Sequence, residues 1–298
     1  MTEATTVPRV VDAHVHHWDP SRVDWYPYLA SDDALAGLGM KDVTRMRRLF
    51  DQDIYLAESA RWNVEKYVHV AAAVGPHILT ETRELGELTA RTGHPDAIIG
   101  GLDPGVGAAA ALAQLDSQVM SPRFRGIRVS EGMDSASPVG RAILGALQER
   151  GLVYDLVVHP DEMADTARAL EAFDTLTIVV EHTGWPLSED AEHVERWRDG
   201  MARLAALGEH VHCKLSGLAM TLNRFDTAAF RPWIEHCLEV FGDTRCFFAS
   251  NFPVDGLFGD FDDLYNVYDE VTAGLDAAAR ARLFADNAER VYGITGVS

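Results

Sequence analysis

The feature of this sequence that most constrains its fold is a series of short apolar runs that recur at regular intervals. From the second run to the eighth, successive runs begin 24 to 35 residues apart, close to the roughly 30 residues of one strand–helix unit. Most runs are almost continuously apolar, which is typical of parallel strands buried on both faces. The predicted strands are RVVDAHV (9–15), KYVHVAA (66–72), AIIGGL (97–102), RGIRVS (125–130), LVYDLVV (152–158), LTIVVE (176–181), HVHCKLS (210–216) and RCFFAS (245–250).

Between these strands lie stretches rich in Ala, Leu, Arg and Glu with helical spacing. Pro138 and Pro160 suit the first turn of a helix, and Asp226 or Thr227 can cap one. Helices are predicted over residues 79–91, 138–150, 160–172, 189–207 and 227–240. Eight strands, each followed by a helix, predict an α/β fold in which the 298 residues form a single (β/α)8 barrel domain.

The gap between the first two strands is longer than the others. It holds the aromatic segment HWDPSRVDWYPYLA, then a predicted helix around 41–50 and another over 52–62. We expect residues 17–40 to form an ordered loop over the barrel mouth. Trp25 and Tyr26 of this loop are candidates for contacting a substrate, because pocket specificity is carried by loop side chains.

The charge balance excludes several classes of partner. With 46 acidic and 26 basic residues the formal net charge is −20, so the chain repels nucleic-acid phosphates and anionic lipid surfaces. The three cysteines, Cys213, Cys237 and Cys246, form no Cys-x-x-Cys pair and predict neither a disulfide framework nor a zinc finger. The amino-terminal segment does not read as a signal peptide, and no apolar run reaches the ~20 residues of a membrane span. A cytoplasmic location is the expectation.

Reactive side chains of such barrels come from the carboxyl ends of the strands and the loops that follow them. A single histidine is more often a packing residue, and a His-x-His pair alone is a weak signal. Histidines at three strand ends that meet on one barrel face are a stronger one. The candidates are His14 and His16 on the first strand, Arg128 on the fourth, His159 after the fifth, His182 after the sixth, Lys214 and Ser216 on the seventh, and Asn251 and Asp255 after the eighth.

Several of these segments together resemble a known family. The motifs VVDAHVHHWDP, GIRVS, VVEHTGWP, CKLSGL, SNFPVDG and ADNAERVYGI occur in order over nearly the whole chain. They resemble the amidohydrolase-related hydrolases, in the branch that contains sugar lactonases and pyrone-dicarboxylate lactonase. The resemblance implies a distorted (β/α)8 TIM barrel that hydrolyses a lactone or related carbonyl ester, without an obligatory cofactor. It leaves a homodimer open.

The resemblance also assigns residues. His14, His16 and His182 match site histidines of the family, and Arg128 matches an arginine that contacts substrate. Lys214 and Ser216 fall in the motif of the seventh strand, where we expect substrate contacts.

One position departs from the family pattern. The residue after the eighth strand that is usually aspartate is Asn251 here. An amide cannot accept a proton at neutral pH and is a poor ligand for a transition metal, so its expected role is substrate contact. Asp255, four residues on, or a histidine such as His159 offers a substitute general base.

The leading hypothesis is a hydrolase that opens a small lactone or related carbonyl ester. The expected partner is a small molecule, either a lactone or one that bears a carboxylate. His14 and His16 would polarise the carbonyl or hold a weakly bound divalent ion such as zinc, and His182 would orient or deprotonate water. Arg128 would bind a substrate carboxylate or the developing negative charge. Two alternatives stay open. A metal-dependent decarboxylase or C–C/C–N hydrolase is favoured by the intact His-x-His, and a barrel that only binds a metabolite is suggested by Asn251.

Overall fold

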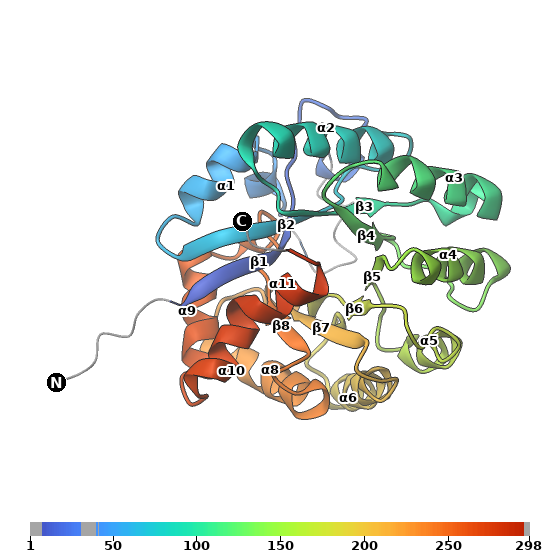
Figure 1. Ribbon diagram of the computed structural model, residues 1–298. Coiled ribbons are helices and arrows are strands. Elements are labelled where there is room, and N and C mark those ends of the chain that lie inside the picture. Colours follow the sequence, from blue (N-terminus) through green and yellow to red (C-terminus); the bar gives the residue numbers. More distant parts are fainter. Residues whose placement is uncertain (1–7, 31–39, 41, 295–298) are drawn as a thin grey trace.

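The structure, a computed structural model, describes residues 8–30, 40 and 42–294. Eight parallel strands follow one another around a single sheet in chain order, with the helices outside them (Figure 1). The first and last strands meet where His16 N donates to Phe252 O at 2.9 Å and Asn251 N donates to His14 O at 2.9 Å. The nearly closed sheet confirms the predicted (β/α)8 barrel. The strands are β1 (Arg9–Val15), β2 (Asn63–Val70), β3 (Ala97–Gly101), β4 (Phe124–Arg128), β5 (Val153–Leu156), β6 (Ile178–Val180), β7 (Val211–Leu215) and β8 (Cys246–Phe248).

Two helices begin where the sequence predicts, at Pro138 and, after the cap Asp226, at Thr227, whereas Pro160 precedes its helix, which begins at Met163. Ser137 Oγ accepts from Gly140 N at 2.9 Å, and the Asp226 carboxylate accepts from Ala229 N at 2.8 Å. The helices are α1 (Gln52–Glu58), α2 (His77–Thr92), α3 (Ala108–Val119), α4 (Pro138–Glu149), α5 (Met163–Leu170), α6 (Ala191–Ala205), α7 (Leu218–Leu222), α8 (Thr227–Phe241), α9 (Phe261–Thr272), α10 (Ala277–Ala281) and α11 (Asn287–Val291), with a π-helical turn over Arg282–Asp286.

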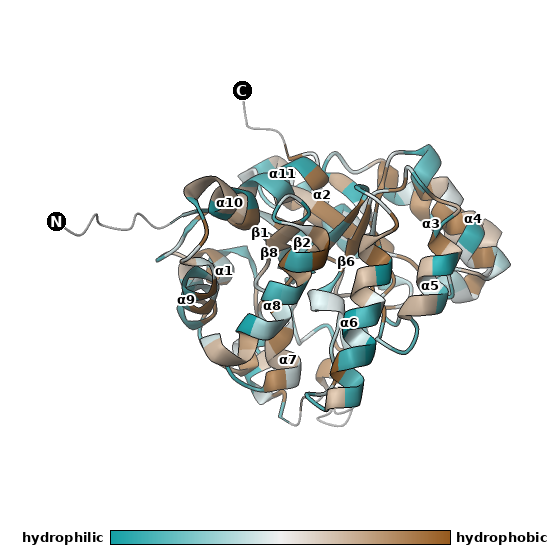
Figure 2. Cartoon of the chain, turned by 90° about the horizontal axis from the view of Figure 1, so that it is seen from below, coloured by the Kyte–Doolittle hydropathy of each residue, from teal (hydrophilic) through white to brown (hydrophobic). Residues whose placement is uncertain are grey.

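The apolar strands form the centre of the molecule, and the helices around them turn many polar residues outward (Figure 2). Inside the barrel, Val11, Val68, Ile99 and Phe247 pack in one cluster with residues from the end of the chain, including Tyr292. The chain's last helix, α11, lies across the barrel in the view of Figure 1. This segment therefore covers one end of the barrel and leaves the other end to the loops that follow the strands.

The prediction of a helix over 41–50 is wrong. Only a single 3-10 turn, Thr44–Met46, forms there, and residue 41 lies outside the described residues. Tertiary partners hold the backbone instead: Trp18 Nε1 donates to Met46 O at 3.0 Å, and Trp18 and Phe50 exchange two backbone hydrogen bonds of 2.9 Å. These bonds compete with helical hydrogen bonds because each residue has only one backbone N–H donor and one carbonyl acceptor.

The predicted loop 17–40 is described in its first part, while residues 31–39 lie outside the described residues. The described part contains the 3-10 turn Pro27–Leu29, and Tyr28 OH donates to Ala72 O at 2.8 Å, just beyond β2. This bond ties the segment to the carboxyl end of a barrel strand. Within the described part of the chain, no helix is long and apolar enough to cross a membrane.

Candidate active site

The two histidines of the first strand lie side by side. Asp12 pairs with Tyr67 on β2 and Val15 pairs with His69, so β1 has one extra residue between Asp12 and Val15, the stretch that contains His14. The His14 and His16 rings lie edge to face at 4.7 Å, with their Nε2 atoms 3.0 Å apart. His16 Nδ1 is 2.7 Å from Val70 O. Both side chains are buried.

His182 reaches the same point from a strained turn after β6. Four successive residues, 182 to 185, have positive φ angles of 51°, 56°, 69° and 46°, and three of them are not glycine. Each such residue costs about 1–2 kcal/mol, and tertiary bonds hold the turn: Thr183 Oγ1 donates to Ser216 O at 3.1 Å and Trp197 Nε1 donates to Thr183 O at 2.8 Å. The turn brings the His182 ring to 4.6 Å from His14.

Glu181 also lies at this centre, although it was not among the site residues predicted from the sequence. Its buried carboxylate places Oε1 3.3 Å from His14 Nδ1 and Oε2 3.7 Å from His182 Nε2. Neither oxygen accepts a hydrogen bond from any described residue. Arg128, at the end of β4, brings Nη1 to 3.6 Å from Oε2. A signal was present, because an acidic residue directly after a buried apolar strand needs a partner in the interior.

A buried ion pair supports the histidines from the barrel interior. Lys214 Nζ donates to Asp155 Oδ2 at 2.6 Å and lies 3.3 Å from His14 Nδ1. Tyr292 OH donates to the same carboxylate at 2.9 Å, and all three side chains are fully buried. Asp155 was also missed, although a carboxylate inside the apolar run LVYDLVV requires a buried cation or donor.

Burial sets the protonation of the three histidines. It lowers the pKa of His14, His16 and His182 well below the ordinary value of 6.5, and the nearby charges of Arg128 and Lys214 lower each further. All three rings are therefore neutral at pH 7 and have one bare nitrogen each.

Asn251 and Asp255 form a hydrogen-bonded pair after β8. Asn251 has a positive φ of 57° and donates from Nδ2 to Asp255 Oδ1 at 2.9 Å. Burial raises the pKa of Asp255 to about 8, and its Oδ2 has no hydrogen-bond partner among the described residues. Below that pH the carboxyl group is protonated and cannot take a proton from water.

Other predicted site residues lie farther from the three histidines. The half-buried His159 ring contacts Trp185 edge to face at 5.5 Å, and Trp185 in turn contacts His182 at 4.9 Å. Ser216 is close, with Oγ 3.0 Å from His182 Nδ1. The Trp185 indole thus separates His159 from the three histidines, whereas Ser216 contacts His182 directly.

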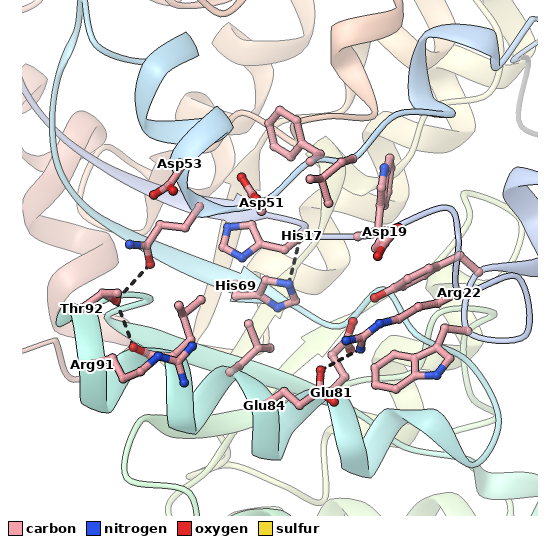
Figure 3. A pocket seen from close by; sticks show the side chains of 18 residues that line it. His17, Asp19, Arg22, Asp51, Asp53, His69, Glu81, Glu84, Arg91 and Thr92 are labelled. Atoms are coloured by element: carbon pink, nitrogen blue, oxygen red, sulfur yellow. Dashed lines mark hydrogen bonds and ion pairs between the residues drawn. The ribbon is translucent and has the colours of Figure 1, made fainter.

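Trp25 and Tyr26 line a different cavity, of about 460 Å³, between the segment after β1, the start of α1 and helix α2 (Figure 3). Figure 3 shows His17 and His69 within it, joined by the bond from His17 N to His69 Nε2. The Trp25 ring stacks on His77 at 5.0 Å. None of His14, His16 and His182 lines this cavity.

A second cavity, of about 580 Å³, opens beside Arg128. It is formed by the segments that follow β2, β3 and β4, at the carboxyl ends of these strands. Arg128 is 8% exposed and is the only basic side chain among the described residues that line this cavity. It therefore joins the buried cluster to a space that can hold a small molecule.

The sequence model of the amidohydrolases matches residues 11–294. The chain belongs to the amidohydrolase family. This amidohydrolase is therefore a hydrolase that acts on small molecules, as the motifs predicted. An L-fucono-1,5-lactonase of Burkholderia ambifaria is 28% identical to it over 295 residues, 95% of each chain. An uncharacterised Sinorhizobium fredii protein is 32% identical over 300 residues, 95% of this chain and 98% of its own. The crystal structure of a Burkholderia multivorans amidohydrolase with bound zinc superposes with a TM-score of 0.82 and 25% identity, covering 96% of this chain and 99% of that one.

The donor atoms of this amidohydrolase fit a divalent ion. One ligand atom each from His14, Glu181 and His182 lie within 4.8 Å of one another, and the Glu181 oxygens accept no hydrogen bond from a described residue. Two imidazoles and a carboxylate are a donor set that zinc accepts. When bound, such an ion polarises a carbonyl group and acidifies a water molecule. The expectation that no metal is required stays a prediction.

Proposed function

We propose that this amidohydrolase opens a small lactone by attack of water, with His182 as the general base. The observation that carries the proposal is the placement of the His182 nitrogens. Nδ1 is 3.0 Å from Ser216 Oγ, while Nε2 is 3.7 Å from the nearest Glu181 oxygen, too far for a hydrogen bond. When Ser216 Oγ accepts a hydrogen bond from Nδ1–H, Nε2 is bare and can accept a proton from water.

The proposed reaction needs one base and one group that stabilises negative charge. His182 Nε2 takes a proton from water as the water oxygen bonds to the lactone carbonyl carbon. The ring C–O bond then breaks, and the leaving oxygen takes the proton back from His182. Arg128 is placed to stabilise the carbonyl oxygen as it becomes negative, because its buried Nε has no hydrogen-bond partner among the described residues.

The cavity beside Arg128 favours an uncharged substrate. Three carboxylates line it, Asp103, Glu131 and Asp134, against the single guanidinium. A substrate with two carboxylates would meet net repulsion there, whereas a polyhydroxylated lactone can donate hydrogen bonds to these acids. A neutral sugar lactone is therefore the proposed substrate class, and the similarity to L-fucono-1,5-lactonases supports it.

One observation favours a second function. The His14, Glu181 and His182 donor set suits a metal-dependent decarboxylase or a C–C/C–N hydrolase. A metabolite-binding barrel without catalysis is the third alternative, since Asn251 replaces a carboxylate.

The test is a hydrolysis screen with a pH indicator over six-carbon sugar lactones, a pyrone dicarboxylate and hydroxybenzoates. We expect acid release from at least one neutral sugar lactone and a loss of about 10²–10⁴-fold in kcat for His182→Asn. His210→Asn, at the opposite end of β7, is the matched control and should keep full activity. Activity on hydroxybenzoates alone would favour the decarboxylase. Thermal stabilisation by a lactone without turnover would favour the binding protein.

A further inference from the structure

The buried lysine beside His14 has a fixed position. Asp155 accepts from Lys214 Nζ at 2.6 Å and is itself held by Tyr292 OH at 2.9 Å. The ammonium also lies 5.4 Å from the centre of the Tyr292 ring. These contacts hold Nζ 3.3 Å from His14 Nδ1. An ammonium group can only donate hydrogen bonds, so His14 Nδ1 accepts in this contact. Glu181 Oε1 is also 3.3 Å from Nδ1 but has no hydrogen-bond partner among the described residues.

The hydrogen bonds of the neighbouring histidine agree with this arrangement. With Nδ1 accepting from Lys214, the proton of the His14 ring lies on Nε2, which donates to His16 Nε2 at 3.0 Å. His16 Nε2 therefore accepts, and His16 Nδ1 carries the proton that it donates to Val70 O at 2.7 Å, since a carbonyl oxygen only accepts. The hydrogen bonds run in one direction from Lys214 to Val70.

We propose that Lys214 holds His14 in the Nε2-protonated tautomer and thereby keeps the His14–His16 pair from chelating a divalent metal ion. Chelation requires a lone pair on both Nε2 atoms. Their separation of 3.0 Å suits two nitrogens that each lie about 2.0–2.1 Å from one zinc ion. The proton on His14 Nε2 occupies that position. Moving it to Nδ1 would place an N–H against the ammonium of Lys214.

The same lysine opposes the other way of binding an ion. In the donor set of His14, Glu181 and His182, the Glu181 carboxylate lies 3.3 Å from His14 Nδ1, the nitrogen that faces the ammonium. Lys214 Nζ lies 3.6 Å from Glu181 Oε1, so a divalent cation at this carboxylate would meet a like charge at short range. Either mode of metal binding through His14 is therefore weakened by Lys214. The inference holds whichever ester the protein hydrolyses, since it concerns the affinity for a metal ion and not a substrate.

Replacing Lys214 by Met should reverse both effects. The thioether donates no hydrogen bond and carries no charge. Glu181 Oε1, 3.3 Å from His14 Nδ1, can then accept a hydrogen bond from a proton on that nitrogen, which leaves Nε2 bare. A carboxylate that accepts from the second nitrogen of a ligating histidine is a recurrent support of metal sites.

The experiment measures zinc affinity on the metal-free full-length protein by competition with a chromophoric chelator. We expect Lys214→Met to bind zinc at least tenfold more tightly than the wild type. Lys66→Met is the matched control: it removes a lysine that pairs with Glu289, outside the centre, and should leave the affinity unchanged. Nitrogen-15 NMR of the histidine rings should show Nε2-protonated His14 in the wild type, assigned by its loss in His14→Asn.

Two results would overturn the proposal: unchanged zinc affinity in the folded Lys214→Met protein, or Nδ1-protonated His14 in the wild type. Lys214→Met leaves Asp155 without its cation, which can impair folding or itself attract zinc. The double variant Lys214→Met/Asp155→Asn removes that charge and must show the same tightening. The NMR result on the wild type decides the matter even if neither variant folds.

Discussion

Gly217 lies directly against the imidazole of His182. A Cβ atom at this glycine would come within 2.7 Å of His182 Cβ and Cγ and 2.8 Å of Nδ1. The glycine also has a positive φ of 68°, which disfavours any other residue. The backbone of Gly217 therefore restricts the position of the His182 ring. The contact joins the first residues after β7 to the proposed base after β6.

Gly217→Ala is therefore expected to displace the His182 ring. We predict a fall in kcat of at least tenfold, together with a loss of stability of about 1–2 kcal/mol from the positive φ. Gly151→Ala separates the two effects, because Gly151 has a similar φ of 61° but nothing within 4 Å of the added Cβ. That control should lower the melting temperature and leave kcat unchanged. A fully active Gly217→Ala protein would show that the ring position is not critical.

The pH dependence of kcat/KM should reveal the buried base. His182 acts as a base only when unprotonated, so the rate falls as the pH drops through its pKa. Burial, with Arg128 and Lys214 nearby, holds that pKa well below 6.5. We expect kcat/KM to stay level through pH 6.5 and to fall only at distinctly lower pH, before the protein unfolds. An acid limb centred near 6.5 would instead indicate a histidine outside this centre.

Arg128→Lys tests the proposed contact with the carbonyl oxygen. The guanidinium donates from Nη2 to Ala71 O while Nη1 faces Glu181 at 3.6 Å. A lysine keeps the charge but has no planar fork, so it cannot serve these partners and a substrate together. We expect the fall in kcat/KM to correspond to about 1–3 kcal/mol of lost transition-state stabilisation, mainly through a rise in KM. Arg150→Lys, whose arginine pairs with Asp116 on the surface, is the control. An unchanged KM would place Arg128 outside the substrate site.

The sequence predicts the barrel well because the continuous apolar runs and the helix caps are local signals. His14, His16 and Arg128 could be found as strand-end residues for the same reason. Glu181 and Asp155 were harder to assign, since their roles depend on partners from other strands. The failure at 41–50 has a similar cause: the bonds of Trp18 to the Thr44–Met46 turn join distant segments and override local helical spacing.

Asp255→Asn tests the consequence of the raised pKa of the Asp255 carboxyl group for stability. Its pKa of about 8 in the folded protein exceeds the ordinary 3.8, so between these values the folded state retains a proton that the unfolded state releases. Stability therefore falls as the pH rises through this window. The variant has no such carboxyl group and does not lose stability in this way. Its melting temperature should therefore rise relative to that of the wild type as the pH increases from 5 to 8.

The activity of the same variant tests the role of Asp255 in catalysis. Because the carboxyl group is protonated at pH 7, we expect kcat to stay within about threefold of the wild type. Asn251→Asp is the companion variant, since it introduces a carboxyl group at the neighbouring position that hydrogen-bonds to Asp255. A fall in kcat of about 10²–10⁴ in folded Asp255→Asn would identify Asp255 as the base.

Chelation tests the dependence on metal. Asn251 offers no carboxylate ligand, and Lys214 Nζ lies 3.3 Å from His14 Nδ1 and 3.6 Å from Glu181 Oε1, so an ion is held weakly in the wild type. We expect at least half of the hydrolytic activity to survive dialysis against a strong chelator, with metal removal verified by mass spectrometry. Lys214→Met, treated in parallel, should retain more zinc through the same dialysis. Complete loss of wild-type activity, restored by one divalent metal, would contradict this prediction and favour the metal-dependent alternative.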